Sequence, residues 1–260
     1  MILKNKEDII NNWLPRYTKR PLDEFTDLVL LTNFNHYVEL FADRYNVPIL
    51  GREGSMPNAS ADGITIINFG IGSPNAALIM DLLQAVSPRA VLFLGKCGGL
   101  RSKHNKIGDY ILPSAAIRGE GTSNDYFPIE IPALPAFSLL RAASTSIRDI
   151  GRDYWTGTVY TTNRRVWEHD EAFRIKLKTS RAYAVDMESA TLFTVAFHNN
   201  IPLGAVLLVS DMPLLPDGIK TDEMDKKTTA DYAEEHLDIG IRTLHIIREN
   251  TITLKHLRFD

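Results

Sequence analysis

A chain of 260 residues, 44% of them hydrophobic and 23% charged, can bury a sizeable core, which excludes a disordered protein, a collagen-like fibre and a coiled coil. The formal net charge of −3 argues against a broad basic surface for nucleic acid, and no apolar run approaches the roughly 20 residues of a membrane helix. Because Cys97 is the one cysteine, no intrachain disulfide can form, and we expect a soluble cytoplasmic protein without a nucleic-acid or membrane partner.

The chain divides into a polar head and one large domain. Residues 1–22 are charged and polar, and we expect them to form an N-terminal arm ahead of a domain over 23–260. Strands are predicted over 28–31, 64–69, 90–94, 109–112, 154–161 and 203–209, and helices over 35–45, 73–86, 136–150, 187–199 and 228–248. This alternation predicts a single α/β domain, with a twisted, mostly parallel or mixed sheet flanked by helices.

Three predicted elements carry residues that could bind or act on a ligand where strands end, and ligands of such sheets bind there. Glycines within 95–99 would let the backbone approach a ligand, and a tight structural turn is the alternative. Asp211 follows an apolar run, so burial would raise the pKa of its carboxyl and suit it to be a general acid, with a helix cap as the alternative. Glu188 could accept hydrogen bonds from two sugar hydroxyls, although the helix dipole alone favours acidic residues there.

Other candidates are weaker when they are taken singly. Met187 could pack against a sugar, but methionine is more often part of the core. Tyr160, Trp155 and Trp167 lie close together in the sequence and could stack on a base, although most such side chains belong to the core or to a subunit interface. His36 could be a ligand or a base, with a structural histidine as the commoner interpretation. Three cations could pair with a phosphate group: Lys96, Arg118 and Arg165. No histidine, cysteine and carboxylate residues show metal-site spacing, so we expect neither a metal nor a cofactor.

Six segments share an order and a spacing that single glycine turns would not specify. They are residues 70–77, 93–100, 107–113, 118–122, 184–190 and 209–211. Together they are similar to the motifs of the nucleoside phosphorylase and nucleosidase superfamily, and the likeness extends over about residues 27–248. The resemblance implies a nucleoside phosphorylase-like α/β fold, a small-molecule substrate, and a homo-oligomer that is a hexamer or another assembly built from dimers.

Within the superfamily, the sequence looks most like bacterial AMP nucleosidases. The segments that carry this likeness are 31–34, 95–101, 156–162, 167–168, 186–191 and 235–242. The likeness implies that AMP and water give adenine and ribose 5-phosphate without a cofactor. Well-known members are longer, and 260 residues leave no room for their extra N-terminal domain, so we expect a short form. The alternatives are a purine or uridine phosphorylase, a methylthioadenosine-type nucleosidase and a nucleotide sensor without turnover.

The resemblance also implies roles for individual residues. Asp211 matches the general acid that protonates the purine at N7, and Glu188 matches the carboxylate that holds the ribose hydroxyls. Met187 would lie beneath the sugar, and Tyr160 falls where the family stacks an aromatic ring on the base. The residues whose backbone would line base and sugar are Cys97, Gly98 and Gly99.

The sequence departs from the phosphorylase pattern at the place where inorganic phosphate binds. Phosphorylases that resemble it carry an arginine two positions before the strand-end glycine, and Phe93 stands there instead. Residues 32–35 also replace the family's phosphate loop. Both departures favour water as the nucleophile, because a phosphate ion would lack its cationic partner. His36 falls where related hydrolases handle that water, and the 5′-phosphate of AMP would be left to the three cations named above.

Overall fold

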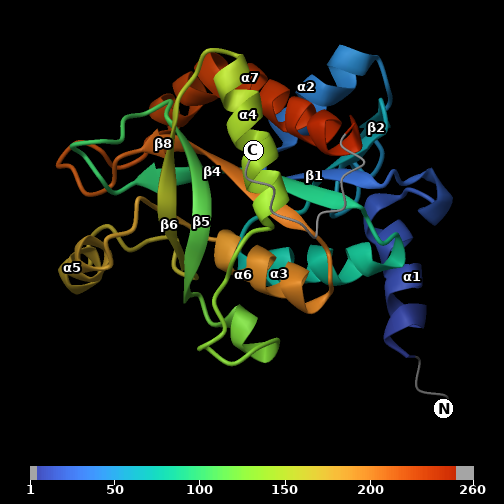
Figure 1. The fold of residues 1–260 in the computed structure, drawn as a ribbon, viewed down its shortest axis with the longest axis horizontal. Helices are drawn as coiled ribbons and strands as arrows, with labels where there is room; N and C mark the ends of the chain where they lie inside the picture. The colour runs from blue at the N-terminus through green and yellow to red at the C-terminus, as the bar shows by residue number, and fades with distance from the viewer. Residues whose placement is uncertain (1–4, 250–260) are drawn as a thin grey trace, which may run out of the picture.

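The computed structural model describes residues 5–249, which form an eight-stranded sheet with helices on both faces (Figure 1). The strands are β1 (Leu28–Thr32), β2 (Asn58–Ala61), β3 (Ile64–Asn68), β4 (Ala90–Gly99), β5 (Tyr110–Gly119), β6 (Tyr154–Thr162), β7 (Ala184–Asp186) and β8 (Leu203–Asp211). The α-helices are α1 (Lys6–Thr18), α2 (Asn35–Tyr45), α3 (Ser73–Leu82), α4 (Phe137–Asp149), α5 (Glu171–Thr179), α6 (Ser189–His198) and α7 (Asp222–Glu249).

The sheet is mixed and partly closed on itself. Its strand order is β2-β3-β1-β4-β7-β6-β5-β8, and β4 also pairs with β8, so the five strands from β4 to β8 form a small barrel. β1, β3, β4 and β8 run parallel, and β5, β6 and β7 run the other way. The two groups meet where the carboxyl end of β4 pairs antiparallel with β7 through Gly98↔Val185 and Gly99↔Ala184, and where the start of β5 pairs antiparallel with β8.

Each face of the sheet has its own apolar core. Leu28 and Leu30 of β1 pack with residues of α2, α4 and α7, whereas Val29 and Leu31 pack with residues of α1, α3 and α6. Figure 1 shows these two groups of helices on opposite sides of the sheet. Burial of this kind stabilises the fold by about 25 cal/mol per Å² of apolar surface. The fully apolar runs 90–94 and 203–209 lie in neighbouring strands at the centre, as buried parallel strands should.

The N-terminal segment differs from the predicted arm over its described part. It contains α1, whose Ile10 and Leu14 lie one helical turn apart and are buried in the core beside α3. Apart from Trp13, the exposed side chains of the helix are charged or amide groups, which is why the segment reads as polar. Residues 6–18 therefore belong to the packed domain.

Several other elements depart from the sequence expectations. β2, α5 and β7 are not predicted, and α7 begins at Asp222 rather than at residue 228. The glycine-containing run 95–99 is not a turn, because it continues β4. Because of this extension, the end of β4 that carries candidate binding residues pairs with β7.

A buried polar link ties α2 to α7 and β8. The Tyr37 hydroxyl lies 2.9 Å from His236 Nδ1, and His236 Nε2 lies 3.0 Å from the carbonyl oxygen of Val206. Complete burial lowers the pKa of His236 to about 3, so the ring stays neutral and can donate to Val206 while accepting from Tyr37. Since Tyr37 is in the first turn of α2, the link also fixes the preceding β1–α2 connection, which carries part of the site.

Candidate active site

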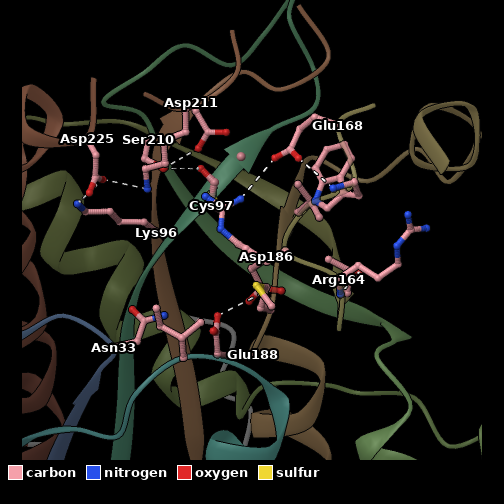
Figure 2. Close-up of a pocket in the computed structure, with 18 of the residues that line it drawn as sticks. Asn33, Lys96, Cys97, Arg164, Glu168, Asp186, Glu188, Ser210, Asp211 and Asp225 are labelled. Atoms are coloured by element: carbon pink, nitrogen blue, oxygen red, sulfur yellow. Dashed lines mark hydrogen bonds and ion pairs between the residues drawn. The ribbon is translucent and has the colours of Figure 1, made fainter. Parts of the chain in front are cut away.

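A cavity of about 270 Å³ lies where the carboxyl ends of the central strands meet (Figure 2). Six segments supply its lining: the ends of β4 and β8, the β1–α2, β3–α3 and β6–α5 connections, and the junction of β7 with α6. A seventh contribution comes from the start of α7 and the residues before it, which fold back over the end of β8. The lining residues used below are Asn33, Lys96, Cys97, Gly98, Arg165, Trp167, Glu168, Met187, Glu188, Asp211, Lys220 and Asp225.

Asp211 is the last residue of β8 and is 9% exposed. Burial raises the pKa of its carboxyl, and the nearby charge of Glu168 raises it further. A hydrogen bond of 2.8 Å from the Ser210 hydroxyl, together with the charges of Lys220 and Arg165, opposes the rise. The carboxyl is thus shifted toward the protonated form and faces the cavity, as a proton donor must.

Glu188 joins β7 to α6 and is buried at the opposite end of the cavity from Asp211 (Figure 2). Burial and the charge of Asp186 raise its pKa to about 8. Its carboxylate accepts hydrogen bonds from the backbone N–H of Gly72 (2.8 Å) and of Met187 (3.3 Å), and from the Asn33 side chain. Gly72 has φ +94°, a conformation that L side chains rarely adopt, so glycine is needed to present this N–H.

Asp186 holds the junction between β7 and α6 in place. Its carboxylate accepts from the Thr161 hydroxyl at 2.6 Å and from the backbone N–H of Ser189 at 2.8 Å, which caps α6. The side-chain amide oxygen of Asn33, in contrast, is buried and has no hydrogen-bond partner among residues 5–249. This end of the cavity therefore holds the Glu188 carboxylate, which accepts hydrogen bonds from three neighbours, and one free acceptor beside it.

One wall of the cavity carries two lysines that share a single carboxylate. Lys96 Nζ lies 2.9 Å from Asp225 Oδ1 and 2.6 Å from the Thr229 hydroxyl, and Lys220 Nζ lies 2.9 Å from the same Asp225 oxygen. Burial pushes the pKa of Asp225 up, but the two lysines bring it below its usual value. Because one carboxylate neutralises one of two ammonium groups, this wall keeps a net positive charge that suits an anion.

The opposite wall comes from the β6–α5 connection. Arg165 Nη1 lies 3.4 Å from Glu168 Oε1, and Glu168 Oε2 accepts from the backbone N–H of Trp167 at 3.0 Å. Trp167 packs into a small apolar cluster with Tyr160 and Leu177 while still lining the cavity. This wall offers an indole surface and a charged pair close to Asp211.

Of the residues proposed from the sequence, seven line the cavity: Lys96, Cys97, Gly98, Arg165, Met187, Glu188 and Asp211. Burial raises the pKa of the Cys97 thiol well above its usual value, so Cys97 contributes as a neutral wall. Gly99 lies one position beyond the lining, where it pairs with Ala184. The other three candidates lie outside the cavity lining.

Arg118, Tyr160 and His36 do not line the cavity. The Arg118 guanidinium is held among the residues that follow β5, where it donates to the Phe127 carbonyl at 2.6 Å and to the Ser123 hydroxyl at 2.9 Å. Tyr160 is 2% exposed and packs edge-on against Phe173, so its ring belongs to the core. His36 projects from the first turn of α2 with a side chain that is 46% exposed.

Sequence reasoning missed several residues that line the cavity. Glu168 enters the sequence analysis only as part of the resemblance, and Trp167 takes the place beside the cavity that the resemblance gave to Tyr160. Lys220 and Asp225 lie far beyond the end of β8, and no local pattern shows that the chain returns to the site. Asn33 enters the sequence analysis only within residues 32–35, which replace the family's phosphate loop. Its position as a polar residue directly after a buried strand is the signal that could have identified it as a site residue.

Within residues 5–249, no group of three or more histidine, cysteine and carboxylate side chains is placed to hold a metal ion. Over the same residues, no helix has both the length and the apolar character needed to cross a membrane.

Comparison with known proteins identifies the class of protein that this fold and site define. Residues 27–245 match the phosphorylase superfamily, and the chain belongs to that superfamily. It is 31% identical to an AMP nucleosidase of Escherichia coli over 281 aligned positions, which cover 90% of this chain and 58% of the E. coli protein. It is also 31% identical to a guanosine phosphorylase of Halorubrum lacusprofundi, with 74% and 78% of the two chains covered.

Solved structures show the same relationship. The crystal structure of an AMP nucleosidase from Bacteroides thetaiotaomicron is 60% identical in sequence, covers 95% of this chain and 100% of its own, and superposes with a TM-score of 0.85. A purine nucleoside phosphorylase from Toxoplasma gondii shares the fold at 18% identity with a TM-score of 0.79. The predicted α/β fold and the resemblance to AMP nucleosidases are therefore confirmed, whereas this chain spans a little over half the length of the E. coli relative.

Proposed function

We propose that the chain is an N-glycosidase that hydrolyses AMP to adenine and ribose 5-phosphate, in the cytoplasm and as part of purine salvage. The observation that carries the reaction class is the placement of Asp211 and Glu188 at opposite ends of one cavity, with the Asp211 carboxyl shifted toward its protonated form. The choice of AMP rests on 60% identity to an AMP nucleosidase over that protein's full length.

Asp211 acts as the general acid in this mechanism. As the bond between ribose C1′ and purine N9 breaks, its electron pair moves into the purine ring, and Asp211 delivers a proton to N7. The leaving group is then neutral adenine rather than an anion, and such help is worth about 10²–10⁴-fold in rate. Trp167 and the backbone of Gly98 would flank the base beside Asp211, while Cys97 contributes a neutral wall.

Glu188 holds the ribose and stabilises its developing positive charge. With N–H groups of Gly72 and Met187 fixing its oxygens, the carboxylate can accept from the sugar hydroxyls without a change of position. Met187 lines the cavity next to it and would pack beneath the sugar. Water then adds to C1′, and the proton it loses passes through solvent to the Asp211 carboxylate, which gives ribose 5-phosphate and restores the acid.

Water is the nucleophile we propose, rather than inorganic phosphate. Phe93, which stands where related phosphorylases carry an arginine, is fully buried and packs against Phe69 in the core, with ring centroids 5.7 Å apart. That position therefore supplies no cation to the cavity. We assign the 5′-phosphate of AMP to the wall formed by Lys96 and Lys220, because Asp225 leaves one positive charge there unneutralised. Arg165 is engaged with Glu168 instead, and Arg118 lies outside the cavity.

Purified protein is expected to release adenine from AMP at the same rate with and without inorganic phosphate, since no phosphate nucleophile is required. Chromatography of the products, with adenosine, inosine and methylthioadenosine as competing substrates, checks both the reaction and the substrate. Turnover that requires phosphate would make the chain a phosphorylase. Turnover confined to substrates without a 5′-phosphate would point to another nucleosidase, and AMP binding without release would point to a sensor.

We also propose that the chain forms a homo-oligomer, a hexamer or another assembly of dimers. An apolar groove of about 650 Å³ lies between α6 and the segment before α4, at the edge of the domain. The large apolar side chains most exposed around it are Leu134, Phe137 and Phe197, and patches of this kind commonly mark protein interfaces. Sedimentation velocity is expected to show a species of at least two chains at micromolar concentration. A stable monomer would contradict the proposal.

A further inference from the structure

We propose that Glu168 makes the site selective for purines that carry an amino group at position 6, so that adenine nucleotides are cleaved in preference to 6-oxo purine nucleotides. The inference rests on the proposed function, because it concerns the base of the nucleotide that Asp211 would protonate. It assigns to Glu168 a role that neither its spacing nor its neighbours in the sequence reveal.

Glu168 lies close to Asp211 in the cavity. Its side chain is 14% exposed and lines the same cavity as Asp211. The two carboxyl groups are close enough that the charge of Glu168 raises the pKa of Asp211. Figure 2 shows them above the centre of the pocket, with the Glu168 carboxylate directed toward the space beside Asp211.

The edge of the purine that Asp211 would protonate also carries the substituent at position 6. N7 and the substituent at position 6 lie side by side on one edge of the base. In adenine this edge presents an acceptor and an N–H donor, and in 6-oxo purines it presents two acceptors. If Asp211 donates to N7, the neighbouring group that meets position 6 decides which purine fits. A carboxylate accepts from an amino group and repels a carbonyl oxygen.

The hydrogen bonds of Glu168 leave it free for this contact. Oε2 accepts from the Trp167 N–H and Oε1 is 3.4 Å from Arg165, so each oxygen uses one of its acceptor sites. An ionised carboxylate has about four such sites, so both oxygens can accept again. The Trp167 and Arg165 contacts also hold the carboxylate in place before the base arrives, which favours discrimination.

The test compares AMP with IMP as substrates for the wild-type protein and for Glu168→Gln. Glutamine keeps the shape but can donate to a carbonyl oxygen, so the ratio of kcat/KM for AMP to that for IMP is expected to fall by about 100-fold or more. An unchanged ratio in a variant that still cleaves AMP would overturn the role of Glu168 and leave the proposed function intact. Absence of base release by the wild type would instead overturn the proposed function.

Two matched variants separate the base contact from other effects. Arg165→Met removes the ion pair but keeps the carboxylate, so the preference for AMP should stay within about threefold of the wild type even if both rates fall. Glu171→Gln changes an exposed carboxylate on the neighbouring helix and should alter neither rate. If Glu168→Gln fails to fold, inhibition of Glu168→Asp by adenine and by hypoxanthine gives the same comparison. Equal weakening of both inhibitors would contradict the proposal.

Discussion

Replacing Asp211 with asparagine is expected to lower kcat for AMP by about 10²–10⁴-fold, because the amide cannot deliver a proton to N7. The KM should change little, since asparagine keeps the size of the side chain at the end of β8. Steady-state release of adenine measures the loss. Full turnover by the variant would show that the leaving base is protonated by another group.

A substrate with a better leaving group provides the decisive control for Asp211. Nitrophenyl riboside 5-phosphate releases a phenolate that needs no proton, so Asp211→Asn should cleave it at nearly the wild-type rate. Asp217→Asn, in the exposed segment after β8, is the matched carboxylate control and should behave as the wild type on both substrates. Equal losses of Asp211→Asn on both substrates would indicate a damaged site instead of a missing acid.

Replacing Glu188 with glutamine is expected to reduce kcat/KM by about 10²–10³-fold, since the ribose would lose the negative charge that stabilises its transition state. The loss should shrink on 2′-deoxy-AMP, which already lacks one hydroxyl partner, and comparing the two substrates isolates this contact. A loss of the same size on both substrates would place the effect of Glu188 outside the sugar contact.

The pH profile gives the same variant a second readout. The mechanism we propose needs Glu188 ionised and Asp211 protonated, so low pH removes the first form and high pH removes the second. Because the pKa of Glu188 is raised to about 8 and that of Asp211 is also raised, the wild-type profile of kcat/KM should be bell-shaped, with one limb near pH 8. Glu188→Gln should lose the ascending limb, and Asp211→Asn the descending one. A wild-type rate independent of pH would contradict both assignments.

Much of the fold could be predicted because its central strands are apolar on both faces. Runs such as 90–94 and 203–209 have no amphipathic alternative, and they form neighbouring strands as expected. β7 could not be predicted, because three residues give no periodicity and its place depends on pairing with both β4 and β6. α1 was obscured by its charged face, although Ile10 and Leu14 carry the helical spacing.

Site residues could be predicted where a single residue follows a buried strand. They could not be predicted where tertiary packing determines which of two nearby residues faces the cavity. Asp211 and Glu188 both stand at element ends and both line the cavity. Tyr160 and Trp167 are equally plausible stacking residues in the sequence, but Tyr160 faces the core because β6 alternates its faces before the chain turns toward the cavity. Lys220 reaches the site through the fold-back after β8, which the Met212 N–H closes by donating to the Gly218 carbonyl.

The pairing of β4 with β7 determines how far Asp211 lies from Glu188. Asp211 belongs to the strands parallel to β4 and Glu188 follows β7, so the two groups are spaced by the two residue pairs that join these halves. A methyl group on Gly98 would come within 2.9 Å of Pro213 and 3.2 Å of Val185, and one on Gly99 within 2.6 Å of the Met212 sulfur. β7 and the segment after β8 can pack this closely on the end of β4 because these two positions lack side chains. Gly98, whose backbone we propose to flank the base, and Gly99 thus also fix the spacing between the two carboxyl groups.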